Sequence, residues 1–86
     1  MSHSKRITIQ TKIIEVLEKN KWYEGCQKFK CAFTCESKTG IPRLCVAWQR
    51  FPNLEEGNEA IITGKFVNNV FMVWDMRMRR LANEEK

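Results

Sequence analysis

Hydrophobic and polar residues alternate along much of this chain, which is the period of a β-strand with one buried face. The alternation is clearest in Lys28–Glu36. One face of this segment carries Phe29, Cys31, Phe33 and Cys35, and the other carries Lys28, Lys30, Ala32 and Thr34. We therefore predict a strand here that turns its Phe and Cys side chains to a core.

The first apolar segment, Arg6–Leu17, also starts with alternation but changes phase at Ile14 and Val16. A phase change in an alternating run predicts a long strand with a bulge or bend. The same residues fit a helical stripe over Thr11–Lys19, so a helix is the alternative. The β-branched Ile and Thr content favours the strand.

The middle of the chain predicts a third strand and the connections around it. Glu18–Gln27 is interpreted as a connection that carries two aromatic residues, and Ser37–Pro42 as a turn. Arg43–Phe51 alternates again, with Leu44, Val46 and Trp48 on one face. Because Trp48 follows two aliphatic residues in phase, it is a candidate for the core as well as for a binding surface.

The last third predicts a β-hairpin. Pro52–Glu59 is expected to be a loop or a single helical turn, and it is followed by strands over Ala60–Val67 and Val70–Met78. Asn68-Asn69 suits a two-residue turn, because asparagine tolerates left-handed backbone angles. That turn pairs Val67 with Val70, Lys65 with Met72 and Thr63 with Trp74. Both faces carry large apolar groups, so the pattern leaves the core face open, and Gly64 marks a bend.

Five short strands in 86 residues need to close on themselves, since an open sheet leaves exposed edges and an uncovered apolar face. We predict an all-β fold, a small five-stranded barrel of the oligonucleotide-binding (OB) type, with the option of one short helical turn between strands three and four. An SH3-like barrel is the nearest rival. The chain has room for a single domain over residues 1–86, and Met1–Arg6 and Ala82–Lys86 are expected to be flexible tails.

Charge and composition narrow the function. Residues 1–50 hold ten Lys and Arg against four Glu, whereas residues 51–86 hold five against six acidic residues. A concentrated positive surface captures polyanions. No apolar run reaches the roughly 20 residues that span a bilayer, so an intracellular location is expected: the cytoplasm, the nucleoid or, in a eukaryote, the nucleus.

Several residues in the middle of the chain resemble a known family. Leu54-Glu55-Glu56-Gly57 resembles a "leucine-x-x-glycine" loop, and Ala60–Phe66 resembles the strand that follows it. With its flanks, Phe33–Phe66 is similar to bacterial-type single-stranded DNA-binding proteins and their primosomal relatives. The resemblance implies an OB fold more firmly than it implies nucleic acid. Two traits differ, since the connection before Ala60 is shorter and no acidic, glycine-rich tail follows Met78.

Metal binding and catalysis find little support. The cysteines at positions 26, 31, 35 and 45 lack the paired spacing of common zinc sites and fit reduced, buried thiols, with two disulfides as the alternative in an oxidising compartment. The single histidine, His3, lies in the expected tail, so no catalytic pair can be assembled. We expect no metal, no cofactor and no enzymatic activity.

The function predicted from these patterns is sequence-tolerant binding of single-stranded nucleic acid, DNA more than RNA. OB domains bind single strands across strands two and three, where cations neutralise phosphates and aromatic rings stack on bases. The candidate residues are Lys12, Trp22, Tyr23, Lys28, Lys30, Arg43, Trp48 and Arg50. The alternative is an OB subunit that binds proteins of a replication or repair complex, which an exposed strip of Met72, Trp74, Met76 and Met78 would favour. A homodimer suits both hypotheses, and no membrane partner is expected.

Overall fold

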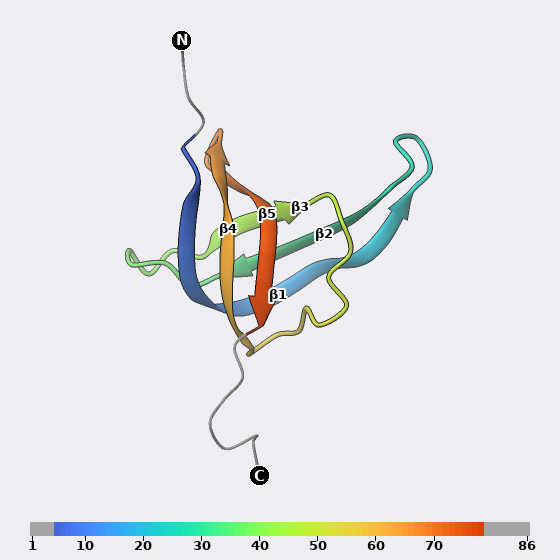
Figure 1. Ribbon diagram of the computed structural model, residues 1–86. Helices are drawn as coiled ribbons and strands as arrows, with labels where there is room; N and C mark the ends of the chain where they lie inside the picture. Colours follow the sequence, from blue (N-terminus) through green and yellow to red (C-terminus); the bar gives the residue numbers. More distant parts are fainter. Residues whose placement is uncertain (1–4, 79–86) are drawn as a thin grey trace.

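The computed structural model describes residues 5–78, and they form five β-strands joined by turns (Figure 1). The strands are β1 (Ile7–Tyr23), β2 (Lys28–Cys35), β3 (Arg43–Ala47), β4 (Glu59–Val67) and β5 (Val70–Met78). Of the two predicted tails, residues 1–4, with His3, and residues 82–86 lie outside the described part of the chain.

The five strands form a closed barrel in the order β1-β2-β3-β5-β4. All neighbouring pairs are antiparallel except β3 and β5, which are parallel. Closure depends on β1, because its first half pairs with β4 and its second half with β2. The structure therefore confirms the prediction of a small five-stranded barrel of the OB type.

β1 is a strand throughout, so the helical alternative over Thr11–Lys19 is wrong. Its pairing with β2 is irregular at three places between Ile13 and Lys21, which confirms the predicted bend. The predicted connection over Glu18–Gln27 is wrong, because β1 continues to Tyr23 and the turn spans only residues 24–27. The ends of β1 and β2 project beyond the barrel as a two-stranded hairpin (Figure 1). Because this part of β1 has no core to face, its sequence does not alternate, and periodicity could not identify it as a strand.

The barrel interior is lined by many small side chains. On β2, Cys31, Phe33 and Cys35 are fully buried, as predicted. On β3 the predicted core face is wrong, since Cys45 and Ala47 are the buried residues. Trp48 lies just beyond the strand and is 38% exposed. β4 and β5 complete the core with Ala60, Ile62, Phe71, Val73 and Met76.

The β4–β5 hairpin has the predicted two-residue turn, with positive φ angles of 51° at Asn68 and 70° at Asn69. The predicted register holds from the turn to Gly64, which pairs with Val73. A bulge then pairs Thr63 with Asp75 rather than with Trp74. A Cβ atom on Gly64 would collide with the backbone carbonyl of Met72, so a glycine is required where the strand bends.

The connection between β3 and β4 covers one end of the barrel without a helical turn, so the loop alternative is the correct one. Leu54 is completely buried and belongs to the core. The loop also pairs with the bend of β1, because Gly57 N donates to Ile13 O at 2.8 Å and Ile13 N donates to Asn58 O at 2.9 Å. The leucine and the glycine of the "leucine-x-x-glycine" loop thus anchor this connection.

The four cysteines are free thiols, three of them buried and Cys26 exposed. Cys35 Sγ lies 3.6 Å from Cys45 Sγ. Among the residues that the structure describes, none forms a helix long and apolar enough to cross a membrane.

Candidate nucleic-acid interface

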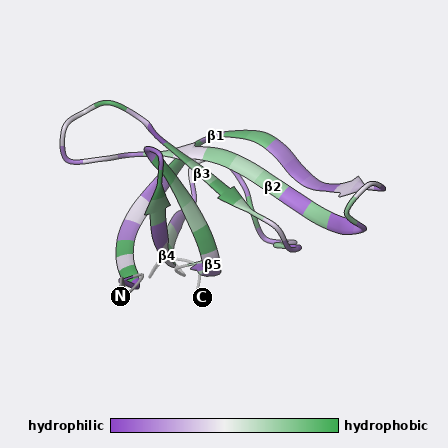
Figure 2. Ribbon diagram, turned by 90° about the horizontal axis from the view of Figure 1, so that it is seen from above, coloured by the Kyte–Doolittle hydropathy of each residue, from purple (hydrophilic) through white to green (hydrophobic). Residues whose placement is uncertain are grey.

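The outward-facing side chains of β2, β3 and β5 form one continuous surface, here called the outer face. Strand pairing places Ala32 beside Val46, Thr34 beside Leu44, and Val46 beside Met72. Leu44 is 37% exposed and Val46 and Met72 are half-buried, whereas Ala32 is buried, so this apolar row is open to solvent on β3 and β5. Figure 2 shows that β3 and β5 are mainly hydrophobic, whereas hydrophilic stretches mark the hairpin strands of β1 and β2. The outer face is therefore apolar in its middle and charged toward the hairpin.

Two aromatic rings and a lysine meet where the outer face reaches the hairpin. The rings of Tyr23 and Trp48 pack edge to face, with centroids 5.5 Å apart. The ammonium of Lys30 lies 5.4 Å from the Tyr23 centroid and 5.3 Å from the Trp48 centroid. Lys21 adds a second cation 5.5 Å from the Tyr23 ring. Cations near exposed rings are the elements from which single-strand binding surfaces are built.

Glu18 fixes this cluster in place. The hydroxyl of Tyr23 donates to both carboxylate oxygens of Glu18, at 2.9 and 3.0 Å. Lys30 Nζ lies 3.8 Å from Glu18 Oε1. The hydrogen bond to Glu18 also raises the pKa of Tyr23 above its ordinary value, so the phenol keeps its proton. One carboxylate therefore holds both the ring and the ammonium.

Trp22 faces the other side of the hairpin from Tyr23. Side chains alternate along a strand, so these two neighbours point in opposite directions. Trp22 pairs with Phe29, and the two ring centroids are 5.0 Å apart. The guanidinium of Arg50 lies 5.1 Å from the Phe29 centroid. The prediction that both aromatics lie in a connection is wrong, since each is on β1 and they face opposite sides.

The eight predicted site residues thus separate into three groups. Tyr23, Lys28, Lys30 and Trp48 lie together, with Lys28 paired in register with Tyr23. Trp22 and Arg50 lie across the hairpin, as described above. The last two residues lie apart from both of these groups. Lys12 is in register with Glu59 on β4, and Arg43 stacks on Phe66 near the end of β4.

The outer face carries a second indole that sequence reasoning did not assign to the site. The parallel register of β3 and β5 places Trp48 and Trp74 two residues beyond the Val46–Met72 pair. Trp74 is 37% exposed, and Arg6 and Lys65 lie 5.1 and 6.0 Å from its ring centroid. Of the predicted Met72–Met78 strip, Met76 is buried, so the strip is not one exposed surface.

Sequence reasoning also missed Glu18 and Lys21, because both were assigned to a connection. No local pattern in the sequence identifies them, because Lys21 and Lys30 become neighbours only if the strand extends to Tyr23. A scan against protein-family models, a search of curated proteins and a search of solved structures each returned no match.

Proposed function

We propose that this protein binds single-stranded nucleic acid across the outer face, with the Tyr23–Trp48–Lys30 cluster as its centre. The observation that carries the proposal is the Lys30 ammonium of β2 beside two aromatic rings, Tyr23 at the end of β1 and Trp48 just beyond β3, on a closed OB-type barrel. Bases stack on exposed aromatic faces whatever their identity, and lysines neutralise the phosphates. The binding is therefore expected to tolerate sequence, and DNA is the first substrate to test.

The electrostatic contribution follows from the lysines of the cluster. Lys21, Lys28 and Lys30 lie on the same side of the hairpin, since Lys21 pairs with Lys30 and Lys28 pairs with Tyr23. Each phosphate contact on a single strand contributes about −0.7 to the slope of log affinity against log salt. Three contacts predict a slope near −2, so a fourfold rise in salt weakens binding roughly 15- to 20-fold.

Stacking supplies the part of the affinity that salt leaves unchanged. A stacked base contributes about 1–3 kcal/mol, which corresponds to roughly 5- to 150-fold in affinity. Trp48 exposes 38% of its surface. Trp74 lies on the neighbouring strand β5, and both indoles are two residues beyond the Val46–Met72 pair. A strand that crosses β3 and β5 can reach both indoles, whereas Trp22 lies on the opposite side of the hairpin.

The test is a tryptophan fluorescence titration of the full chain with an unstructured oligothymidylate at two salt concentrations. We expect quenching, the salt dependence given above, and a loss of affinity of at least about fivefold in Lys30→Ala and in Trp48→Ala. Lys12→Ala is the matched control, because this exposed lysine lies on the β1–β4 side of the barrel. Absence of quenching at micromolar protein, or equal losses in Lys30→Ala and Lys12→Ala, refutes the proposal.

The apolar middle of the outer face favours a second candidate, an OB subunit that binds proteins of a replication or repair complex. Leu44 and Trp74 expose 37% of their surfaces each on this row. Exposed apolar patches of this kind mark protein interfaces. Native mass measurement of the isolated chain discriminates the two: a monomer that binds the oligonucleotide supports the first, and a chain that needs another protein for solubility supports the second.

A further inference from the structure

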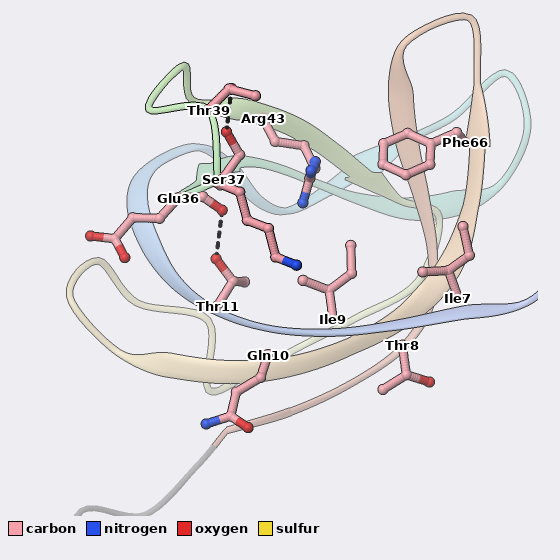
Figure 3. A pocket seen from close by; sticks show the side chains of 11 residues that line it. Ile7, Thr8, Ile9, Gln10, Thr11, Glu36, Ser37, Thr39, Arg43 and Phe66 are labelled. Carbon is pink, nitrogen blue, oxygen red and sulfur yellow. Dashed lines mark hydrogen bonds between the residues drawn. The ribbon is translucent and has the colours of Figure 1, made fainter.

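The two ends of the barrel differ. The loop with buried Leu54 covers the end where β3 stops and β4 begins. At the other end a cavity of about 680 Å³ lies between the first half of β1, the turn Ser37–Pro42 and the end of β4 (Figure 3). Mouths of small β-barrels are common sites for small ligands, and this volume lies within the usual range for them.

One wall of this cavity is apolar and faces a cation. Figure 3 shows Ile7 and Ile9 directed from β1 toward Arg43 and Phe66 on the opposite wall. The guanidinium carbon of Arg43 lies 5.2 Å from the Phe66 centroid. Phe66 is 45% exposed and its ring packs edge to face on Phe71, so part of its surface is free to contact a ligand. A flat apolar group can pack in this space beside the guanidinium.

The charges at the cavity favour an anion. Arg43 and Lys38 line it, and neither forms a salt bridge with a described residue. Glu36 is the acidic residue of the lining, but Figure 3 shows its carboxylate pointing away while its backbone carbonyl accepts from Thr11 Oγ1 at 2.8 Å. The guanidinium is thus without an acidic partner in the pocket, and its planar fork matches phosphate and carboxylate groups.

The turn that closes the cavity is well ordered by its own side chains. Ser37 Oγ donates to Ile41 O at 2.6 Å and lies 3.0 Å from Thr39 Oγ1, which accepts from Ile41 N at 3.3 Å. The site is therefore formed before any ligand arrives, which lowers the entropic cost of binding.

Two residues of the cavity lining, Thr11 and Arg43, also act on the buried thiol of Cys35. The pKa of Cys35 is lowered, first by its hydrogen bond with Cys45 and then by Thr11 and Arg43, which both line the cavity.

We propose that the open end of the barrel is a second ligand site, separate from the outer face, that binds a nucleotide. Its base packs against Ile7, Ile9 and Phe66, and its phosphate pairs with Arg43 and Lys38. The nucleotide is either a free nucleoside monophosphate or the 5′-phosphorylated end of a strand, which present the same chemistry. The site does not depend on the single-strand binding proposed for the outer face.

The test is an NMR titration of the isotope-labelled full chain with thymidine 5′-monophosphate, thymidine and inorganic phosphate as separate probes. We expect the monophosphate to shift the signals of Ile7, Ile9 and Phe66, and to bind at least about tenfold more tightly than either fragment. Signals of Tyr23 and Trp48 should remain in place. No shifts at millimolar monophosphate, or shifts confined to Tyr23 and Trp48, overturn the proposal whatever the outer face binds.

Variants locate the anion contact. Arg43→Gln is expected to weaken the monophosphate about tenfold, whereas Arg50→Gln, whose cation lies over Phe29 on the hairpin, should leave it unchanged. Lys38→Ala, in an exposed turn, provides a second variant with little risk to folding, and several-fold weakening is expected. Equal affinities in all three variants and the unmodified chain refute the assignment.

A last comparison distinguishes the two sources of the ligand. Oligothymidylates with and without a 5′-phosphate are titrated under the same conditions. If only the phosphorylated strand shifts the cavity signals, the site holds a strand end. If neither strand shifts them while the free monophosphate does, the site is one for a small molecule.

Discussion

Asn20 holds the binding hairpin against the rest of the barrel, and its replacement gives the sharpest test of how the interface is built. Its carboxamide oxygen accepts from Phe51 N at 2.7 Å, and its Nδ2 donates to Phe51 O at 3.3 Å. The same oxygen accepts from the thiol of Cys31 at 3.1 Å. The backbone of Asn20 has a φ of 51°, which is the left-handed region. One residue thus both bends β1 and ties it to the β3–β4 connection.

The cost of Asn20→Ala can be estimated from these contacts. Each of the two hydrogen bonds to Phe51 contributes about 1 kcal/mol, since their loss leaves part-buried backbone groups unpaired. Alanine in the left-handed region adds roughly 1 kcal/mol, because its Cβ crowds the following carbonyl. We expect Asn20→Ala to lower the free energy of unfolding by about 3 kcal/mol. Asn20→Gly loses the hydrogen bonds but tolerates the backbone angle, so we expect about 2 kcal/mol.

The measurement is urea unfolding of the three chains, followed by tryptophan fluorescence. The connection that Asn20 holds also carries Trp48, whereas Tyr23 lies three residues beyond Asn20 on β1. Both variants should therefore loosen the Tyr23–Trp48 contact and weaken oligothymidylate binding several-fold below the unfolding transition. The reasoning is refuted if Asn20→Gly costs as much as Asn20→Ala, or if Asn20→Ala costs less than about 1 kcal/mol.

Two further predictions concern the core. Gly64→Ala should lower the unfolding free energy by about 2 kcal/mol or more, because the new Cβ meets the Met72 carbonyl. Gly25→Ala is the control, and its effect should stay within about 0.5 kcal/mol, because no atom lies near the new Cβ. Equal effects of the two substitutions on thermal unfolding would contradict the bulge geometry. The pKa of Cys35 is lowered from 9.0 to about 6, so between these values the unfolded chain holds more protons than the folded one, and stability rises with pH. The stability advantage of the unmodified chain over Cys35→Ser, measured in urea with reductant, should grow as pH rises through this window and be lost as pH falls to about 6; a flat difference contradicts the assignment.

The sequence alone predicted those parts of the fold in which local rules and tertiary packing agree. On β2, Cys31, Phe33 and Cys35 line the barrel as their alternation in the sequence predicted, although Ala32 between them is buried as well. The Asn68-Asn69 turn was predicted because left-handed angles at two consecutive residues strongly select asparagine and glycine. The register derived from that turn failed only beyond Gly64, where a bulge adds a residue to one strand.

The end of β1 could not be predicted from periodicity, because a hairpin that leaves the barrel has no buried face. Lys21, Trp22 and Tyr23 belong to this hairpin, and what keeps them extended is pairing with Lys28–Lys30 ten or fewer residues away. That pairing also depends on Asn20, whose hydrogen bonds reach Phe51 across 31 positions of sequence. Glu18, Lys21 and Tyr23 of the candidate site were therefore assigned to a connection instead of a strand.

The position of Trp48 follows from the size of the barrel. Both faces of β3 are apolar, and hydrophobicity favours the face with Leu44, Val46 and the indole. A five-stranded barrel, however, has an interior that Phe33, Phe71 and Ile62 already fill, and close-packed interiors do not accept extra volume. The strand therefore turns Cys45 and Ala47 inward, and the larger side chains remain outside. An aromatic outer face is thus a consequence of a narrow core, and enlarging Ala47 to leucine should disrupt the barrel, whereas replacing Val46 with leucine should not.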